Sequence, residues 1–549
     1  MPIFSSLYAL VVDDAPVVVA TVRIMLRKMG LQDDNIHTAK DARTALLLAR
    51  HRPYDIIICD YNFGGGLNGK QIFEELNHDH LLAQGAVFIM VTGEASGPIV
   101  RSIIELEPDE YLLKPYTEKN LHNRLRMVVR RKQALLAIYA AEQEKNPAAG
   151  LKACDELEAR FPLYLTLIKR FRGQFLRDLA RAEEAKDLYE SILRTDNYEW
   201  AQLGLGNSLV DLGDFEGAEK CFASLLAQPV VSVATLSAVS RFELYREDIP
   251  AAIRHITMAS ELVPGHAERE LLLANLCLVE EDYISAAKKY QFYYEANRET
   301  FRDTLVCRLN WIRGLVWQLS ACTDSREKER QRNEIQYHLG QLYRLDPSNA
   351  LNGQLSLIAC HLALIDNDLP TLMPLLKSGI TMVADFDFYA RYHLCYLLSE
   401  LMIDAELPSH LQYAGTQVLT SGSDVISKSQ LLMLKRLKER HQERSTFLAN
   451  AYQSAHEVLQ QKRFMVAMDI YLKIEGRMPY LYRVSLTIMK LLSVVWPAGL
   501  GVDGVRALIG RSDMVIREML TEEALSSLKY QDIYRRACTF VNNHAGTQA

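Results

Sequence analysis

The chain has 549 residues, of which 49% are hydrophobic and 24% charged, so it has an ordinary globular composition and enough length for more than one core. Its 62 basic and 68 acidic residues give a net charge of −6, which argues against partners such as nucleic acid or an anionic membrane. Nine scattered cysteines without a Cys-x-x-Cys pair, and no apolar stretch long enough for a bilayer, argue against a disulfide framework, a zinc site and membrane insertion, so we expect a cytoplasmic protein.

Strand-like apolar segments alternate with helical patterns in the N-terminal part of the chain. Four of these segments, each directly followed by polar residues, are 7–12, 55–59, 86–91 and 111–113. The residues that follow them are, in order, Asp13 and Asp14, Asp60, Thr92, and Lys114 with Pro115. Helical spacing falls between the segments at 17–29, 41–50, 70–77 and 98–105, and again from 118. This alternation predicts an α/β doubly wound parallel sheet, whose strand ends would gather three carboxylates, a hydroxyl and an ammonium group at one edge.

These motifs and their order resemble the receiver domain of two-component response regulators, from Leu7 to about Arg130. The resemblance implies the flavodoxin-like strand order 2-1-3-4-5 for a receiver at residues 1–130. It also implies a phosphorelay in which Asp60 accepts a phosphoryl group from a histidine kinase or a phosphotransfer protein. A flavodoxin-like domain with chance acidic strand ends would leave Thr92 and Lys114-Pro115 unexplained.

Three carboxylates in one crevice would repel each other unless a divalent cation bound there, and Mg²⁺ suits such a site. We expect Asp60 to be the nucleophile and, with Asp14, a direct metal ligand. The backbone carbonyl of Asn62 would be a third ligand, and Asp13 would act through water. The site would catalyse only its own phosphorylation and dephosphorylation, so we do not expect an enzyme acting on other substrates.

Three further residues have expected roles at this edge. Lys114 would contact the phosphoryl oxygens, and its bond to Pro115 is cis in the receiver family. Thr92 would hydrogen-bond a phosphoryl oxygen, and Tyr111 occupies the family's switch-aromatic position. A half-buried strand tyrosine is an equally good interpretation of Tyr111 alone.

The loop after Asp60 departs from the usual receiver pattern, because it reads Tyr-Asn-Phe-Gly-Gly-Gly-Leu-Asn-Gly and has no proline. Three consecutive glycines permit unusual backbone angles beside the metal site. Asn62 and Glu94 match the pair that tunes dephosphorylation in the chemotaxis receiver. That match implies a short-lived phosphate, provided that the glycine loop does not change access of water.

Strand signals end after Lys114, and a continuous helix is expected from 118 to 144. A period of about 34 residues then resembles the tetratricopeptide repeat (TPR), with small residues where helices of a hairpin cross. The residues in register include Gly206, Ala218, Phe222, Ala252, Ile256, Ala286 and Tyr290, and Gly173, Ala185 and Tyr189 fit one unit upstream with a one-residue slip. We assign a TPR solenoid to 131–300 and a degenerate, TPR-like helical region to 301–549, with a clearer repeat near 448–480.

The leading hypothesis is therefore a response regulator that signals by protein–protein binding through its solenoid. Phosphorylation would change the face formed by the fourth helix, fifth strand and fifth helix, and so alter the hold on an unknown protein partner or pair two chains as a homodimer. One alternative is a constitutive TPR scaffold whose receiver is only a docking module. Another is an enzyme hidden within 351–549, against which stands the absence of a second catalytic constellation. The basic run 435–440 fits a polar helix face better than a nucleic-acid site.

Overall fold

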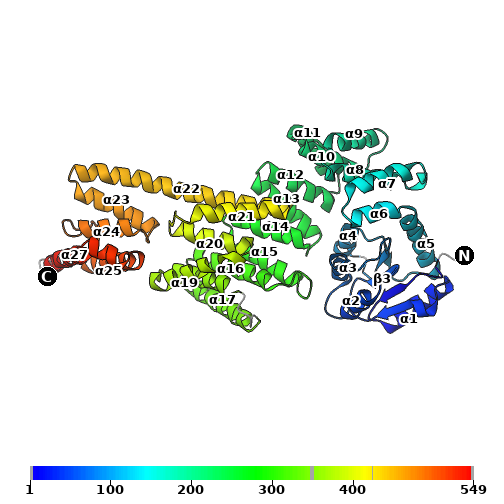
Figure 1. The fold of residues 1–549 in the computed structure, drawn as a ribbon, viewed down its shortest axis with the longest axis horizontal. Helices are drawn as coiled ribbons and strands as arrows, with labels where there is room; N and C mark the ends of the chain where they lie inside the picture. Colours follow the sequence, from blue (N-terminus) through cyan, green and yellow to red (C-terminus); the bar gives the residue numbers. More distant parts are fainter. Residues whose placement is uncertain (1–3, 95, 346–350, 423, 546–549) are drawn as a thin grey trace. The chain divides into compact units, whose positions relative to one another are not determined.

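The computed structural model describes residues 4–94, 96–345, 351–422 and 424–545, in which a five-stranded sheet with its helices is followed by helices alone (Figure 1). They form two compact units, Met1–Leu273 with Gln291–Cys307 and Ala274–Tyr290 with Arg308–Ala549. The predicted boundary at residue 300 therefore falls inside a segment of the first unit. No helix among the described residues is both long and apolar enough to cross a membrane.

The sheet contains five parallel strands, and the four that end at the polar motifs are neighbours within it. The strands are β1 (Ala9–Val12), β2 (Ile36–Ala39), β3 (Ile56–Asp60), β4 (Val87–Thr92) and β5 (Glu110–Leu113). Their order is β2-β1-β3-β4-β5, which confirms the doubly wound topology. In register, Val12 lies opposite Cys59, Asp60 opposite Val91, and Thr92 opposite Leu113. The carboxyl ends of these strands therefore place the polar residues at one edge.

Helices cover both faces of the sheet. They are α1 (Pro16–Lys28), α2 (Ala42–His51), α3 (Gly69–His78), α4 (Gly97–Glu105) and α5 (Glu118–Ala134). Val22 of α1 and Leu125 of α5 belong to the core on one face. Ile72 of α3 and Ile103 of α4 belong to the core on the other face, which α2 also covers. Both faces of the strands are thus buried, as their continuous apolar sequences require.

The expectation of one helix from 118 to 144 is wrong. Helix α5 begins at Glu118 as predicted, with Thr117 as its cap, but the chain leaves helical geometry at Leu135 (φ −107°, ψ 20°) before α6 (Leu136–Gln143) begins. Leu125 packs in the core of the sheet, whereas Leu135 and Ile138 pack in a separate core with α7 (Pro147–Glu158). The chain bends because these two sets of residues are buried in different cores, a tertiary effect that no local breaker signals.

A series of helical hairpins follows with a regular spacing. Its helices are α8 (Leu165–Asp178), α9 (Ala182–Leu193), α10 (Glu199–Asp211), α11 (Phe215–Leu226), α12 (Val233–Tyr245), α13 (Ile249–Leu262), α14 (Ala267–Val279) and α15 (Tyr283–Ala296). The first helices of successive hairpins, α8, α10, α12 and α14, begin at positions 165, 199, 233 and 267, so their spacing is constant. The alanines predicted at helix crossings, Ala185, Ala218, Ala252 and Ala286, are all fully buried.

Replacing Ala252 by leucine tests this register. Ala252 is fully buried in α13 and its carbonyl accepts a hydrogen bond from the Ser240 hydroxyl of α12 (3.0 Å), so added methylenes would push the two helices apart. We expect a loss of about 1–3 kcal/mol in the free energy of unfolding, measured by denaturant titration. The exposed Arg254 on the same helix is the control, since Arg254→Leu should change stability by less than about 0.5 kcal/mol. Equal effects of the two changes would contradict the register.

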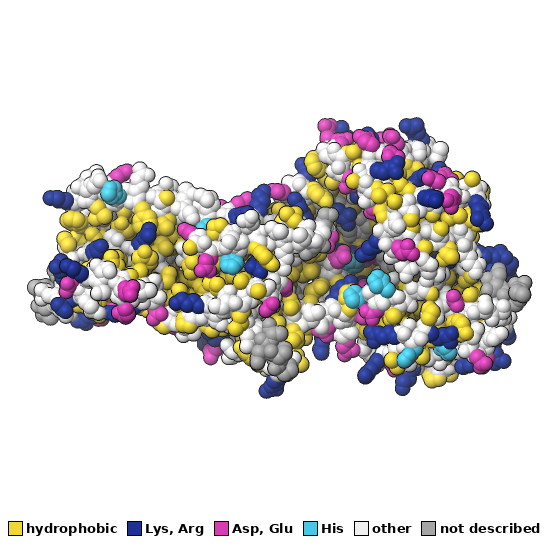
Figure 2. All heavy atoms as spheres, in the orientation of Figure 1, with side chains coloured by type: hydrophobic (Ala, Val, Ile, Leu, Met, Phe, Trp, Pro, Cys, Tyr) yellow, Lys and Arg dark blue, Asp and Glu magenta, His cyan; other side chains and the backbone are white. Residues whose placement is uncertain are grey.

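The rest of the chain is also helical. Its helices are α16 (Leu305–Ala321), α17 (Ser325–Leu345), α18 (Asn352–Ile365), α19 (Leu369–Thr381), α20 (Phe388–Glu400), α21 (Leu407–Ser421), α22 (Val425–Gln460), α23 (Phe464–Arg477), α24 (Tyr482–Leu491), α25 (Val502–Met519), α26 (Glu522–Ser527) and α27 (Tyr530–Ala545). In the predicted late repeat, Ala455 and Ala467 are fully buried where α22 and α23 pack. The basic run 435–440 lies on α22, where Arg440 pairs with Glu400 (2.9 Å). On the face drawn in Figure 2, acidic and basic side chains of the described residues are interspersed.

Candidate functional site

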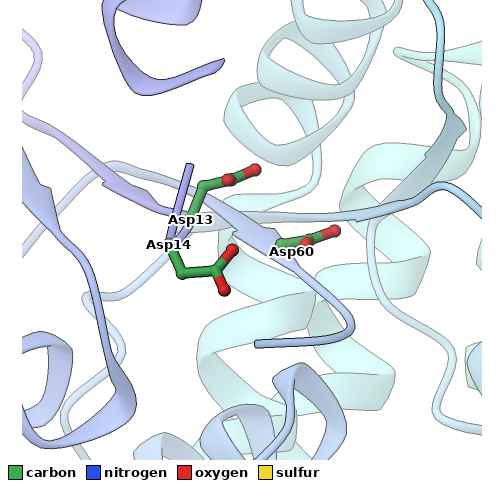
Figure 3. A group of neighbouring side chains, drawn as sticks. All are labelled: Asp13, Asp14 and Asp60. Atoms are coloured by element: carbon green, nitrogen blue, oxygen red, sulfur yellow. The ribbon is translucent and has the colours of Figure 1, made fainter. Parts of the chain in front are cut away.

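Three carboxylates meet at the edge where β1 and β3 end. Asp13 and Asp14 directly follow β1, and Asp60 is the last residue of β3. Figure 3 shows the three side chains beside one another, and one oxygen of each lies within 4.8 Å of the others. Among the residues that the structure describes, this is the one group of three or more acidic, His or Cys side chains with such spacing.

Lys114 joins two of these carboxylates from the end of β5. Its Nζ atom lies 2.8 Å from Asp13 Oδ2 and 3.1 Å from Asp60 Oδ1, and its bond to Pro115 is cis. Burial raises the pKa of Asp60, with a further contribution from Asp13, although Lys114 opposes the shift. Burial alone would lower the pKa of Lys114, but its hydrogen bonds to Asp13 and Asp60 hold that pKa above its ordinary value. Lys114 is therefore a protonated cation beside the carboxylate of Asp60, which is 8% exposed.

Asp13 and Asp14 differ in exposure and in how many of their carboxylate oxygens accept hydrogen bonds from the protein. Asp13 is 4% exposed, and its two oxygens accept hydrogen bonds from the Ala15 N–H (2.9 Å) and from Lys114. Asp14 is exposed, and one of its oxygens accepts a hydrogen bond from the Gly64 N–H (2.9 Å). The clustered carboxylate oxygens suit a hard cation such as Mg²⁺, which takes one or two carboxylates and keeps several waters. Asp14 is the more accessible ligand of the pair.

This difference predicts unequal effects of two substitutions on Mg²⁺ affinity. Asp14→Ala would remove an accessible ligand, whereas Asp13→Ala would remove a carboxylate already held by Lys114 and a backbone N–H. We expect Asp14→Ala to weaken Mg²⁺ binding further than Asp13→Ala, measured by calorimetric titration at fixed ionic strength. The reverse order would mean that the direct and water-mediated roles are exchanged.

The other predicted site residues lie around this group. Thr92 is 1% exposed and its hydroxyl accepts a hydrogen bond from the Glu94 N–H (3.1 Å). The Asn62 amide donates to the Glu94 carboxylate (2.9 Å), so the two residues expected to tune dephosphorylation contact each other directly. Tyr111 is half-buried against the core on the α2–α4 face of the sheet. Its role as a switch stays a prediction.

The glycine loop has the unusual backbone angles that the sequence predicted, and it also makes a contact with Asp14 that the sequence did not predict. Gly65 and Gly66 have φ values of +135° and +79°, angles that favour glycine, and the Gly64 N–H holds Asp14. At the other end of the loop, Asn68 caps α3 and forms a reciprocal capping box with Gln71. The glycines in the sequence indicated an unusual loop, but the hydrogen bond from Gly64 to Asp14, a candidate metal ligand, depends on the folded chain.

A family model matches the first part of the chain, the part that carries this site. Residues 9–126 match the response regulator receiver domain family, and this segment is a receiver domain. Similar solved structures include chemotaxis protein CheY4 of Vibrio cholerae, with 24% sequence identity over 23% of this chain and 98% of that one (TM-score 0.21). Another is the receiver domain of a signal transduction histidine kinase from Syntrophus aciditrophicus, with 18% identity over 23% and 92% of the two chains (TM-score 0.21). No curated protein matches the chain.

Proposed function

We propose that the protein is a response regulator of a phosphorelay, in which Asp60 receives a phosphoryl group from a histidine kinase or a phosphotransfer protein. The observation that carries this proposal is the set of Asp13, Asp14 and Asp60 with Lys114 between two of them. A structural ion pair would not require a third, exposed carboxylate at the same edge.

The chemistry follows from these positions. An Asp60 carboxylate oxygen attacks phosphorus while the bond from phosphorus to the donor breaks, and the donor leaves with that electron pair. Lys114 exchanges its contact with the Asp60 oxygen for one with a phosphoryl oxygen, and the Thr92 hydroxyl donates to another. Asp14 and Asp60, with the Asn62 carbonyl, would hold Mg²⁺, which supplies positive charge for the developing phosphoryl oxygens. The Asn62–Glu94 pair would set how water reaches the phosphorus.

The helical region is the proposed output. The constant spacing of the hairpins from α8 to α15 and the buried alanines support an array of TPR-type hairpins that binds another protein. A close fit between hairpins supports the same proposal, because a Cβ added at Gly204 would lie 2.3 Å from the Tyr189 ring.

Incubation with acetyl phosphate and Mg²⁺ tests the proposal. Intact-mass measurement should show one added phosphoryl group on the wild-type chain and none on Asp60→Asn, since an amide cannot form the acyl phosphate. Equal labelling of the two proteins would assign the acceptor elsewhere. Labelling of the wild type without any change in partner affinity would favour the constitutive scaffold.

A further inference from the structure

Receiver helices α3 and α4 contact two turns of the helical region within the first compact unit. One turn joins α13 to α14, and the other follows α15. The contacts to the first turn are Lys70 Nζ to the Gly265 carbonyl, Arg101 Nε to the Leu262 carbonyl, and Glu105 with Arg269. The contacts to the second are Gln71 Nε2 to the Ala296 carbonyl, Glu74 with Arg302, the Glu75 carboxylate with the Phe301 N–H, and His78 with the Phe301 ring.

Three receiver carboxylates each meet a donor on these turns. Arg302 Nη1 lies 2.6 Å from Glu74 Oε2, and the backbone N–H of Phe301 donates to Glu75. Arg269, only 4% exposed, makes a two-pronged contact with Glu105, the longer prong being 3.0 Å. Charge-assisted hydrogen bonds of this kind are stronger and more directional than neutral ones. The two turns therefore present donors to three carboxylates, beside backbone carbonyls that accept hydrogen bonds from Lys70, Arg101 and Gln71.

The surface formed by the two turns also includes an aromatic stacking contact. The His78 ring stacks on Phe301 with centroids 3.8 Å apart and an interplanar angle of 17°. Glu74 and His78 are four positions apart on α3, so they share one face of that helix. The second turn thus contacts a helix that carries an acidic residue and a flat ring on one face.

The loop beside Asp60 also reaches this contact. Gly64 donates to Asp14 at one end of the loop, while Gln71 binds both the Asn68 N–H (2.9 Å) and the Ala296 carbonyl (3.0 Å) at the other. A Cβ added at Gly66 would lie 3.7 Å from the Glu299 carboxylate on the second turn. The candidate metal site and the helical region therefore share one short loop.

We propose that the two turns, 262–269 and 296–302, form a docking site for an acidic helix of a partner protein, and that α3, together with α4, covers this site until Asp60 is phosphorylated. The inference rests on the proposed function and names its output surface. A cation on Asp14 competes with Gly64 for that carboxylate, and a phosphoryl group on Asp60 adds negative charge beside the loop whose Gly66 faces Glu299. Both effects loosen the α3 contact, which is polar in the way that separable interfaces between domains are.

Hydrogen exchange of the full chain tests the uncovering step. Beryllofluoride with Mg²⁺ should accelerate exchange in 296–302, including the Phe301 N–H, by roughly 5–150-fold, the usual range of allosteric coupling. Asp60→Asn should show no change under the same conditions. Separate acetyl phosphate labelling keeps the two proposals distinguishable: a protein that accepts phosphate on Asp60 but keeps unchanged exchange in 296–302 would overturn the docking site alone.

A peptide probe tests what the surface binds. A helix-constrained copy of residues 69–80 should bind full-length protein more tightly with beryllofluoride than without, by the same roughly 5–150-fold factor. The same peptide with glutamine at both Glu74 and Glu75 should bind at least tenfold more weakly. In the chain, Arg302→Gln should reduce binding, whereas Arg298→Gln, at an exposed arginine of the same turn, should not. Equal binding of the acidic and amide peptides, or equal effects of the two arginine variants, would overturn the proposal.

Discussion

Replacing Gly69 by alanine is expected to disrupt the strand end that carries Asp60 more than any other single added methyl group. Gly69 is the first residue of α3, and a Cβ there would lie 2.2 Å from the Asp60 carbonyl oxygen and 3.0 Å from Tyr61 Cα. Both are backbone atoms, so the strand end that carries Asp60 would have to move. We expect a loss of about 3 kcal/mol in the receiver's free energy of unfolding, by denaturant titration, and loss of acetyl phosphate labelling.

Gly93 provides the matched control for this change. It lies in the same site, between Thr92 and Glu94, and an added Cβ would meet no atom within 4 Å. Gly93→Ala should therefore fold with nearly wild-type stability. If Gly69→Ala behaves like Gly93→Ala, the close approach between α3 and the end of β3 is absent in solution.

Removing the Lys114 charge is expected to have the second largest effect. In Lys114→Met, the carboxylates of Asp13 and Asp60 would face each other without a cation in a site where they are 4% and 8% exposed. Breaking a buried pair costs about 3–5 kcal/mol, and because Lys114 is one-quarter exposed, we expect a smaller loss of roughly 1–3 kcal/mol. The measurement is the denaturant midpoint of the receiver, with exposed Lys119→Met as the control.

The loss of stability in Lys114→Met should depend on pH and on Mg²⁺. Burial already raises the pKa of Asp60, and removal of Lys114 would raise it further. An acid whose pKa is higher in the folded state favours folding when protonated, so the deficit should shrink as the pH falls through that raised pKa. Saturating Mg²⁺ should likewise stabilise Lys114→Met more than the wild type, because the ion replaces the missing charge. If the stability of Lys114→Met relative to the wild type does not change with pH or with Mg²⁺, charge repulsion is not the cause of the loss.

The receiver could be predicted from the sequence because its information is local. Each apolar strand is followed directly by the polar residue that it places at the edge, and Asp60 and Thr92 lie where that reasoning put them. The bend at Leu135 could not be predicted, because it depends on the burial of α5 and α6 in different cores. The contacts of Glu75 and Glu105 were missed for a similar reason, since their partners Phe301 and Arg269 come much later in the chain.

The arrangement of the helical repeats could be predicted from the sequence only in part. The spacing of Ala218 and Ala252 indicated where helices approach, and both are fully buried. Nothing in the pattern of residues indicated that the turns after α13 and α15 would meet the receiver, because each turn reads as an ordinary exposed connection. The face expected to carry the signal, formed by α4, β5 and α5, is also not the one that makes most of these contacts, which come from α3.

The chemical location of the phosphate tests the assignment of Asp60 most directly. The full-length protein would be labelled with acetyl phosphate and Mg²⁺ and then reduced with borohydride, which converts an aspartyl phosphate into homoserine. Peptide mass spectrometry would then map the reduced residue. We expect homoserine at position 60 alone, whereas homoserine at Asp13 or Asp14, or labelled protein with Asp60 intact, would contradict the assignment.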